Sequence, residues 1–101
     1  MAQSKEQLLE LIPHKLKKIQ KPELLETLKT YLYHNQKLKE TADALFVHYK
    51  TVSYRLDKIK KISNIRFDNP EEILQINIGL RILQIIDKRN LSISDNNTSH
   101  F

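Results

Sequence analysis

The chain has 101 residues, and its 17 lysines and arginines against 12 acidic residues give a net charge of +5. This length indicates a single domain. Because the chain has no cysteine, disulfides, thiolate zinc sites and cysteine nucleophiles are excluded. Proteins without disulfides are usual in the cytoplasm, so we expect a cytoplasmic location. One glycine and three prolines leave few tight turns, which favours an all-α fold. The sequence contains neither a transmembrane stretch nor the apolar core of a signal peptide, so no membrane partner is expected.

The first 21 residues predict a short N-terminal helical segment. Its apolar residues follow a helical spacing that Pro13 interrupts. They are Leu8, Leu9, Leu11, Ile12, Leu16 and Ile19. A longer helix is predicted from Pro22, because a proline in the first turn has no helical hydrogen bond to lose. Its amphipathic stripe comprises Leu24, Leu25, Leu28, Tyr31 and Leu32.

Two short helices are predicted after the polar connector 35–37. The first begins near Leu38, and the second covers about 49–62, after a turn over 46–48. The residues expected to be buried are Leu38, Ala42 and Leu45 in the first helix and Val52, Leu56 and Ile59 in the second. Two short helices joined by about three residues are typical of a helix-turn-helix, whose second helix enters the major groove of DNA. Val47 is expected to fill the angle between the two helices.

The positive charge of the chain is concentrated around the second of these helices. Between residues 46 and 66, six lysines and arginines are opposed by Asp57 alone, so this window carries the whole net charge. On a helical wheel, the side opposite the buried residues holds Lys50, Tyr54, Asp57, Lys58 and Lys61, with Ser53 at its edge. Such a basic patch is typical of a polyanion-binding surface, and a merely solvated helix face is the alternative interpretation.

The segment 69–72, Asn-Pro-Glu-Glu, predicts the start of a final helix, with Asn69 as the N-cap and Glu72 completing a capping box. This helix is expected to end at about 87–89, and residues 90–101 are expected to form a disordered polar tail. It carries two apolar stripes, Ile73, Ile76, Leu80 and Leu83 on one side and Leu74, Ile78, Ile82 and Ile85 on nearly the opposite side. A surface helix of a small monomer needs only one. Either the N-terminal helices cover the second stripe, or it forms a homodimer contact or docks against an upstream domain.

Residues 38–59, LKETADALFVHYKTVSYRLDKI, resemble the DNA-binding core of the PucR-type transcription regulators, which include purine-catabolism and sugar-diacid regulators. The shared motif is L-x-x-T-A-x-x-L-x-V-H-x-x-T-V-x-Y-R-L-x-x-I, and the resemblance extends from about Leu11 to Asp87. It implies a compact multi-helix domain over 22–89, with a Fis-like helix-turn-helix that binds double-stranded DNA. In that family the domain lies at the C-terminus of a longer chain with a sensor region, so this is either an excised domain or a regulator without its sensor.

The resemblance also implies roles for individual residues of the second helix. His48 is expected to contact a phosphate or a base edge, and Thr51 a phosphate. Residues expected to read bases are Tyr49, Lys50, Ser53 and Tyr54, although a packing role is favoured for Tyr49. Arg55 is expected either to reach a phosphate or to fix the helix through a salt bridge. Lys58 and Lys61 are expected to bind the DNA backbone, which supplies affinity without sequence information.

Two positions depart from the family pattern. Lys50 stands where asparagine is usual, and Lys37 stands where a small capping residue is common. No acid pair, Ser/His/Asp set, glycine-rich loop or metal-ligand spacing is present, so neither an enzyme nor a cofactor nor a metal is expected, and His14, His34 and His100 are assigned to the surface.

We therefore predict that helix 49–62 binds double-stranded DNA sequence-specifically as part of a transcription regulator. Two alternatives stay open: a Fis-like architectural protein with little sequence preference, and a helical protein–protein adaptor.

Overall fold

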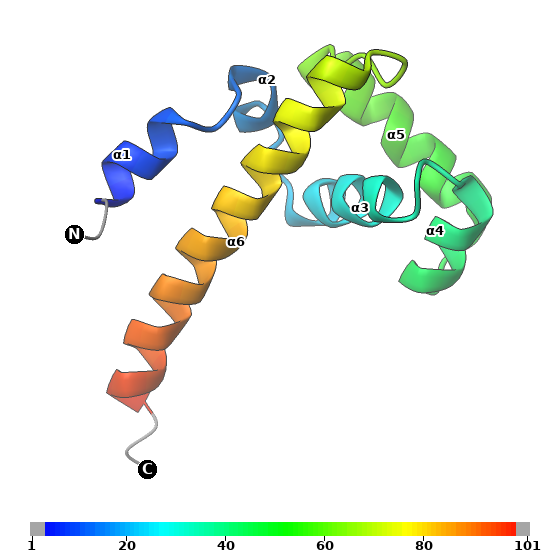
Figure 1. Ribbon diagram of the computed structural model, residues 1–101. Helices are drawn as coiled ribbons and strands as arrows, with labels where there is room; N and C mark the ends of the chain where they lie inside the picture. Colours follow the sequence, from blue (N-terminus) through cyan, green and yellow to red (C-terminus); the bar gives the residue numbers. More distant parts are fainter. Residues whose placement is uncertain (1–3, 99–101) are drawn as a thin grey trace.

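The structure, a computed structural model, describes the backbone of residues 4–98 and the side chains of residues 4–87. Residues 1–3 and 99–101, and with them His100, lie outside this part. The described residues form an all-α fold with six helices (Figure 1), namely α1 Lys5–Glu10, α2 His14–Lys17, α3 Pro22–Tyr33, α4 Leu38–Leu45, α5 Tyr49–Ser63 and α6 Pro70–Thr98. In Figure 1, α6 passes diagonally through the molecule, with α1 on one side and α3, α4 and α5 on the other. Within the described range, every helix is too short or too polar to span a lipid bilayer.

The N-terminal segment forms two short helices, as the interruption at Pro13 predicts. Ser4 and Gln7 begin α1 with a reciprocal capping box. Four of its apolar side chains are buried, namely Leu8, Ile12, Leu16 and Ile19, whereas Leu11 is exposed. The buried side chains belong to the same core as α3, α5 and α6, so this segment is an integral part of the fold.

The helix α3 begins at Pro22, which occupies the predicted first position. Its buried residues are Leu24, Thr27, Leu28 and Leu32. The connector after α3 turns through two residues with positive φ, Asn35 at 57° and Gln36 at 63°. The side-chain amide of Gln36 donates to the carbonyl oxygen of Phe67 at 3.1 Å, which ties this connector to the loop before α6. In that loop Ile65 is buried and Phe67 is half-buried, so both side chains pack inward.

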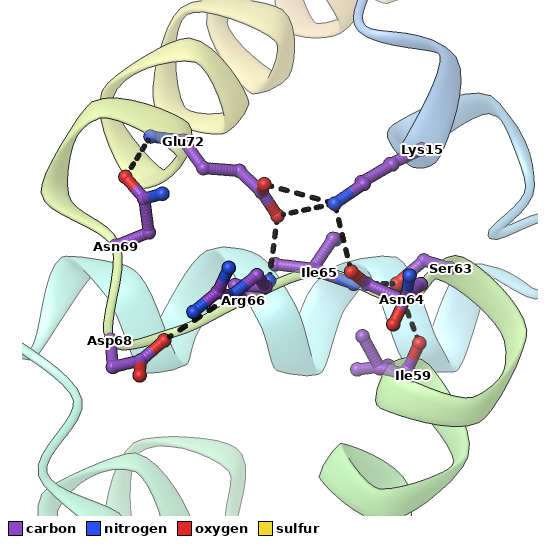
Figure 2. A network of polar contacts seen from close by, with 9 residues as sticks. All are labelled: Lys15, Ile59, Ser63, Asn64, Ile65, Arg66, Asp68, Asn69 and Glu72. Atoms are coloured by element: carbon purple, nitrogen blue, oxygen red, sulfur yellow. Dashed lines mark hydrogen bonds and ion pairs between the residues drawn. The ribbon is translucent and has the colours of Figure 1, made fainter.

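A polar network holds the loop between α5 and α6 (Figure 2). The Lys15 ammonium, from α2, contacts both carboxylate oxygens of Glu72 at 2.9 and 3.0 Å and donates to the carbonyl oxygen of Asn64 at 2.9 Å. The backbone N–H of Arg66 donates to Glu72 at 2.6 Å. The hydroxyl of Ser63 donates to the carbonyl oxygen of Ile59 and accepts from the N–H of Ile65. These contacts join α2, the end of α5 and the first turn of α6.

Asn69 caps α6 as predicted, because its side-chain oxygen accepts from the N–H of Glu72 at 3.1 Å. The reciprocal half of the capping box is absent from the hydrogen bonds of the described residues. The carboxylate of Glu72 instead binds Arg66 and Lys15. The backbone of 90–98 continues α6 to Thr98, where the sequence predicts a disordered tail. No glycine or proline follows Gly79, and each polar residue of this stretch lowers helix propensity by only about 0.7 kcal/mol or less relative to alanine.

The two apolar stripes of α6 have different surroundings. In the first, Ile76 and Leu80 are buried and Ile73 and Leu83 are packed against the core. In the second, Ile82 is buried, but Leu74, Ile78 and Ile85 are exposed. The interpretation that the N-terminal helices cover the second stripe is therefore wrong for these three residues.

The N-terminal segment reaches α6 at Gly79. A Cβ atom added there would lie 2.6 Å from Cδ of Pro13 and 2.8 Å from a methyl carbon of Leu16. The single glycine of the chain therefore permits the close approach of this segment to α6. The face of α6 turned toward Pro13 differs from the face that carries the exposed Leu74, Ile78 and Ile85.

Candidate nucleic-acid interface

The helices α4 and α5 form the predicted helix-turn-helix. Val52 and Ile59 are fully buried and Leu56 nearly so, as expected, and Val47 is half-buried against the core. In α4, Ala42 is buried as predicted, whereas Leu38 and Leu45 are only half-buried. Thr41, which the sequence analysis did not select, is fully buried, and its hydroxyl donates to the carbonyl oxygen of Lys37 at 2.7 Å. Lys37 is the N-cap of α4 and makes no side-chain cap, as its departure from the family pattern suggests.

His48 is the N-cap of α5. Its Nδ1 accepts a hydrogen bond from the backbone N–H of Lys50 at 3.1 Å. Because Nδ1 is the acceptor in this geometry, a neutral imidazole carries its proton on Nε2. The ring also stacks on Tyr49, with centroids 4.5 Å apart and planes inclined by 31°. The imidazole is thereby oriented at the start of α5, with Nε2 left as a donor.

The expected contact residues all lie on α5 or its N-cap, so one helix presents the whole set. Six are exposed, namely His48, Tyr49, Lys50, Ser53, Tyr54 and Lys61. Three are half-buried, namely Thr51, Arg55 and Lys58. The packing role favoured for Tyr49 is wrong, because 49% of this residue is accessible and its ring lies against His48.

Arg55 anchors α5 to α3. One guanidinium nitrogen donates to Oγ1 of Thr27 at 3.3 Å, and that hydroxyl donates in turn to the carbonyl oxygen of Glu23 at 2.8 Å. Of the two roles expected for Arg55, the structure supports that of fixing the helix, through a neutral hydroxyl rather than through a salt bridge. Thr27 was not predicted from the sequence, in which its only signal is a polar residue beside the apolar stripe of α3.

Apart from Arg55, which binds Thr27, the cations of the 46–66 window divide into two groups. Arg66 approaches Asp68 at 3.9 Å, and the Lys60 ammonium lies 5.6 Å from the centroid of the Phe67 ring, so both point toward the loop before α6. Among the described residues, no ion pair involves Lys50, Lys58 or Lys61. The Lys58 ammonium lies 5.3 Å above the Tyr54 ring, a cation–π contact that fixes both side chains on the outward face. The outward face of α5 is therefore positive.

Electrostatics at the two ends of α5 also favour an anion at its start. The first turn contains no acidic residue, and Lys60 and Lys61 lie in the last turn. The N-terminal end of a helix carries a partial positive charge, and its peptide N–H groups favour phosphate oxygens. The exposed lysine Lys50 adds a full charge close to this end.

Comparison with known proteins finds relatives of this chain in Bacillus subtilis. The chain is 33% identical over 67 residues to the uncharacterized protein YsfB of Bacillus subtilis, which covers 66% of this chain and 18% of that protein. It is 36% identical over 63 residues to the Purine catabolism regulatory protein of the same bacterium, covering 62% of this chain and 12% of that protein. It is 34% identical over 62 residues to the Proline-responsive transcriptional activator PutR of Bacillus subtilis, covering 61% of this chain and 15% of that protein.

The chain thus spans less than a fifth of the length of each of these relatives. No solved structure matches it. The sequence profile of the PucR C-terminal helix-turn-helix domain matches residues 24–82, which include most of α3, all of α4 and α5, and most of the packed part of α6. The chain therefore belongs to the family of PucR C-terminal helix-turn-helix domains, the DNA-binding domains of transcription regulators.

Proposed function

We propose that the domain binds double-stranded DNA sequence-specifically by placing α5 in the major groove. The observation that carries this proposal is the division of α5 into two faces. Val52, Leu56 and Ile59 fix one face in the core, while the opposite face presents lysines without ion pairs among the described residues. A major groove about 12 Å wide admits one helix.

In this arrangement the side chains at the start of α5 reach base edges. Lys50, Ser53, Tyr49 and Tyr54 read bases, while His48 donates from Nε2 to a phosphate or a base edge. Thr51, Lys58 and Lys61 bind phosphates and set the position of the helix. Arg55 positions α5 without contacting DNA, since its hydrogen bond to Thr27 holds α5 against α3.

Selection from a random duplex library tests the proposal. We expect recovery of a defined sequence, bound at least 10³-fold more tightly than unrelated duplex at the same salt concentration. Affinity should fall by about 10³ between 50 and 200 mM salt when two copies of the domain bind one duplex, because their phosphate contacts then number about six. Binding with no sequence preference would instead support the architectural role, and absence of any binding at low salt would support the adaptor role.

The exposed stripe Leu74, Ile78 and Ile85 of α6 supports a homodimer as the form that binds DNA. A twofold dimer matches a palindromic site whose half-sites lie one helical turn, ~34 Å, apart. Sedimentation equilibrium tests this with a matched pair of variants. Leu74→Asp should dissociate the dimer. Leu11→Asp is the control and should not, because Leu11 is equally exposed, at 57%, but lies outside the stripe. If Leu74→Asp sediments like the unmodified protein, the stripe has another role, such as docking against an upstream domain.

The length of the relatives bears on the whole protein. Because this chain covers 12–18% of them, we propose that the domain, predicted over 22–89, acts at the C-terminus of a longer cytoplasmic regulator with an upstream sensor region. Its role there is DNA binding rather than catalysis. Expression of the chromosomal reading frame with a C-terminal tag, followed by mass measurement, tests whether such a region is joined to it.

A further inference from the structure

Phe46, in the turn of the helix-turn-helix, combines two unfavourable properties. Its backbone has φ 58° and ψ 41°, the left-handed conformation, at the C-terminal cap of α4. Its side chain is 93% exposed, the largest value among the exposed large hydrophobic residues of the described part. The residue therefore has both a strained backbone and a large apolar ring in water.

The fold itself does not explain a phenylalanine here. The left-handed conformation is disfavoured for residues with a Cβ atom, and glycine or asparagine usually occupies it at the end of a helix. The cap depends on backbone groups only, since the N–H groups of Phe46 and Val47 donate to the carbonyl oxygens of Asp43 and Ala42 at 3.2 and 3.1 Å. Glycine would make both hydrogen bonds without strain. The neighbouring Val47, not Phe46, packs against the core.

The position of Phe46 suggests what its ring contacts. The turn leads directly into His48 and Tyr49, at the end of α5 that is proposed to approach DNA. The ring thus lies in the same exposed segment as side chains of opposite character, the imidazole of His48 and the ammonium of Lys50. Duplex DNA offers apolar surface beside its phosphates, namely the C5 methyl group of thymine in the major groove and the faces of the deoxyribose rings.

We propose that the ring of Phe46 packs on apolar surface of the duplex when α5 occupies the major groove, and so positions the start of α5. This inference rests on the proposed function. It explains a strained, exposed aromatic residue as a contact that is completed only in the complex, since unusual backbone conformations are often retained at binding sites. Before binding, the ring contributes nothing to the core.

The variant Phe46→Gly gives the decisive measurement, because the proposal predicts opposite effects on folding and on binding. The melting temperature should rise by about 4–8 °C as the backbone strain is relieved. Affinity for the selected duplex should fall about tenfold, the usual size of the loss of one contact. The salt dependence should not change, because an apolar contact releases no counterion. Phe46→Leu should keep most of the affinity, and Phe46→Asn repeats the test with the other residue favoured at this position.

Tyr33→Ala provides the control, since Tyr33 is 78% exposed on α3, outside the turn, and its removal should leave DNA affinity unchanged. Replacement of thymine by uracil, one position at a time, distinguishes the two apolar surfaces. A loss of affinity at one position that disappears in Phe46→Gly identifies the methyl group, and no such position identifies the sugar. Unchanged affinity of Phe46→Gly for a duplex that the unmodified protein binds would overturn the inference, as would a fall in melting temperature. If the unmodified protein binds no duplex, the proposed function fails as well.

Discussion

The Lys15 ammonium lies 2.9 Å from Oε1 of Glu72, and this ion pair joins α2 to the first turn of α6 across 57 positions of sequence. The same carboxylate accepts from the backbone N–H of Arg66. The hydrogen bond from Arg66 and then the contact with Lys15 hold the pKa of Glu72 below its ordinary value. Because Lys15 also donates to the carbonyl oxygen of Asn64, the C-cap of α5, the pair fixes the end of α5 as well as the start of α6.

Stability should therefore decrease in acid. A carboxyl group whose pKa is lowered on folding contributes stability above its unfolded pKa, and this contribution is lost as the pH falls through the folded pKa. Glu72→Gln should lower the free energy of unfolding by about 1 kcal/mol at pH 7 and should make it less dependent on pH below about 4.5. Urea unfolding at a series of pH values measures both. Glu71→Gln, one position away at an exposed site, is the control, and an equal effect of the two substitutions would contradict the assignment.

Removal of the Thr27 hydroxyl should loosen the attachment of α5. Thr27→Val keeps the shape of a fully buried side chain but eliminates the acceptor of Arg55 and the donor to Glu23. We expect a loss of about 1 kcal/mol in the free energy of unfolding, measured by urea titration. Thr30→Val, at a half-buried position of the same helix, should have little effect. A Thr27→Val protein as stable as the original would show that Arg55 does not anchor α5.

Gly79→Ala should destabilise the domain although alanine is the better helix former. The added methyl group would meet Pro13 at 2.6 Å and Leu16 at 2.8 Å, and overpacking of this kind costs about 1–3 kcal/mol. The gain in helix propensity is about 1 kcal/mol, so the net loss should be about 1 kcal/mol. Asn77→Ala, at an exposed position of α6, should be neutral or stabilising in thermal unfolding. A higher melting temperature for Gly79→Ala would mean that the N-terminal segment does not pack here.

Two substitutions on α5 should separate positioning from base recognition. Lys58→Ala should weaken binding to all duplexes alike and lower the slope of affinity against salt by about 1, because one phosphate contact is lost. Ser53→Ala should instead change the preference at one base pair. Binding to the selected duplex and its single-base variants at fixed salt measures both effects. If both substitutions weaken every duplex equally, the assumed orientation of α5 is wrong.

Local signals in the sequence were sufficient to predict the helix-turn-helix. Pro22 at the start of α3 and the spacing of Val52, Leu56 and Ile59 depend on neighbours in the chain, and the structure confirms them. Periodicity also identified the outward face of α5. Its roles in DNA binding stay predictions.

Contacts between distant residues were not predictable in this way. A capping-box pattern assigns Glu72 to Asn69, yet the fold brings Lys15 and Arg66 closer to its carboxylate. The hydrogen-bond partner of Arg55 is Thr27, 28 positions away in α3. No pattern in the sequence predicts this pair. A helical wheel shows that α6 has two apolar stripes, but only tertiary packing decides that Ile82 is covered and Leu74 is not.

The unequal distribution of charge has a consequence for the rate of association. The window around α5 carries the whole net positive charge, while the remainder of the chain has a net charge of zero. The charge distribution of the protein is therefore asymmetric. In the field of a polyanion such a molecule experiences a torque that turns its charged side forward before the two surfaces touch. A larger fraction of collisions then arrives in a productive orientation, and added electrolyte slows capture by weakening this rotation.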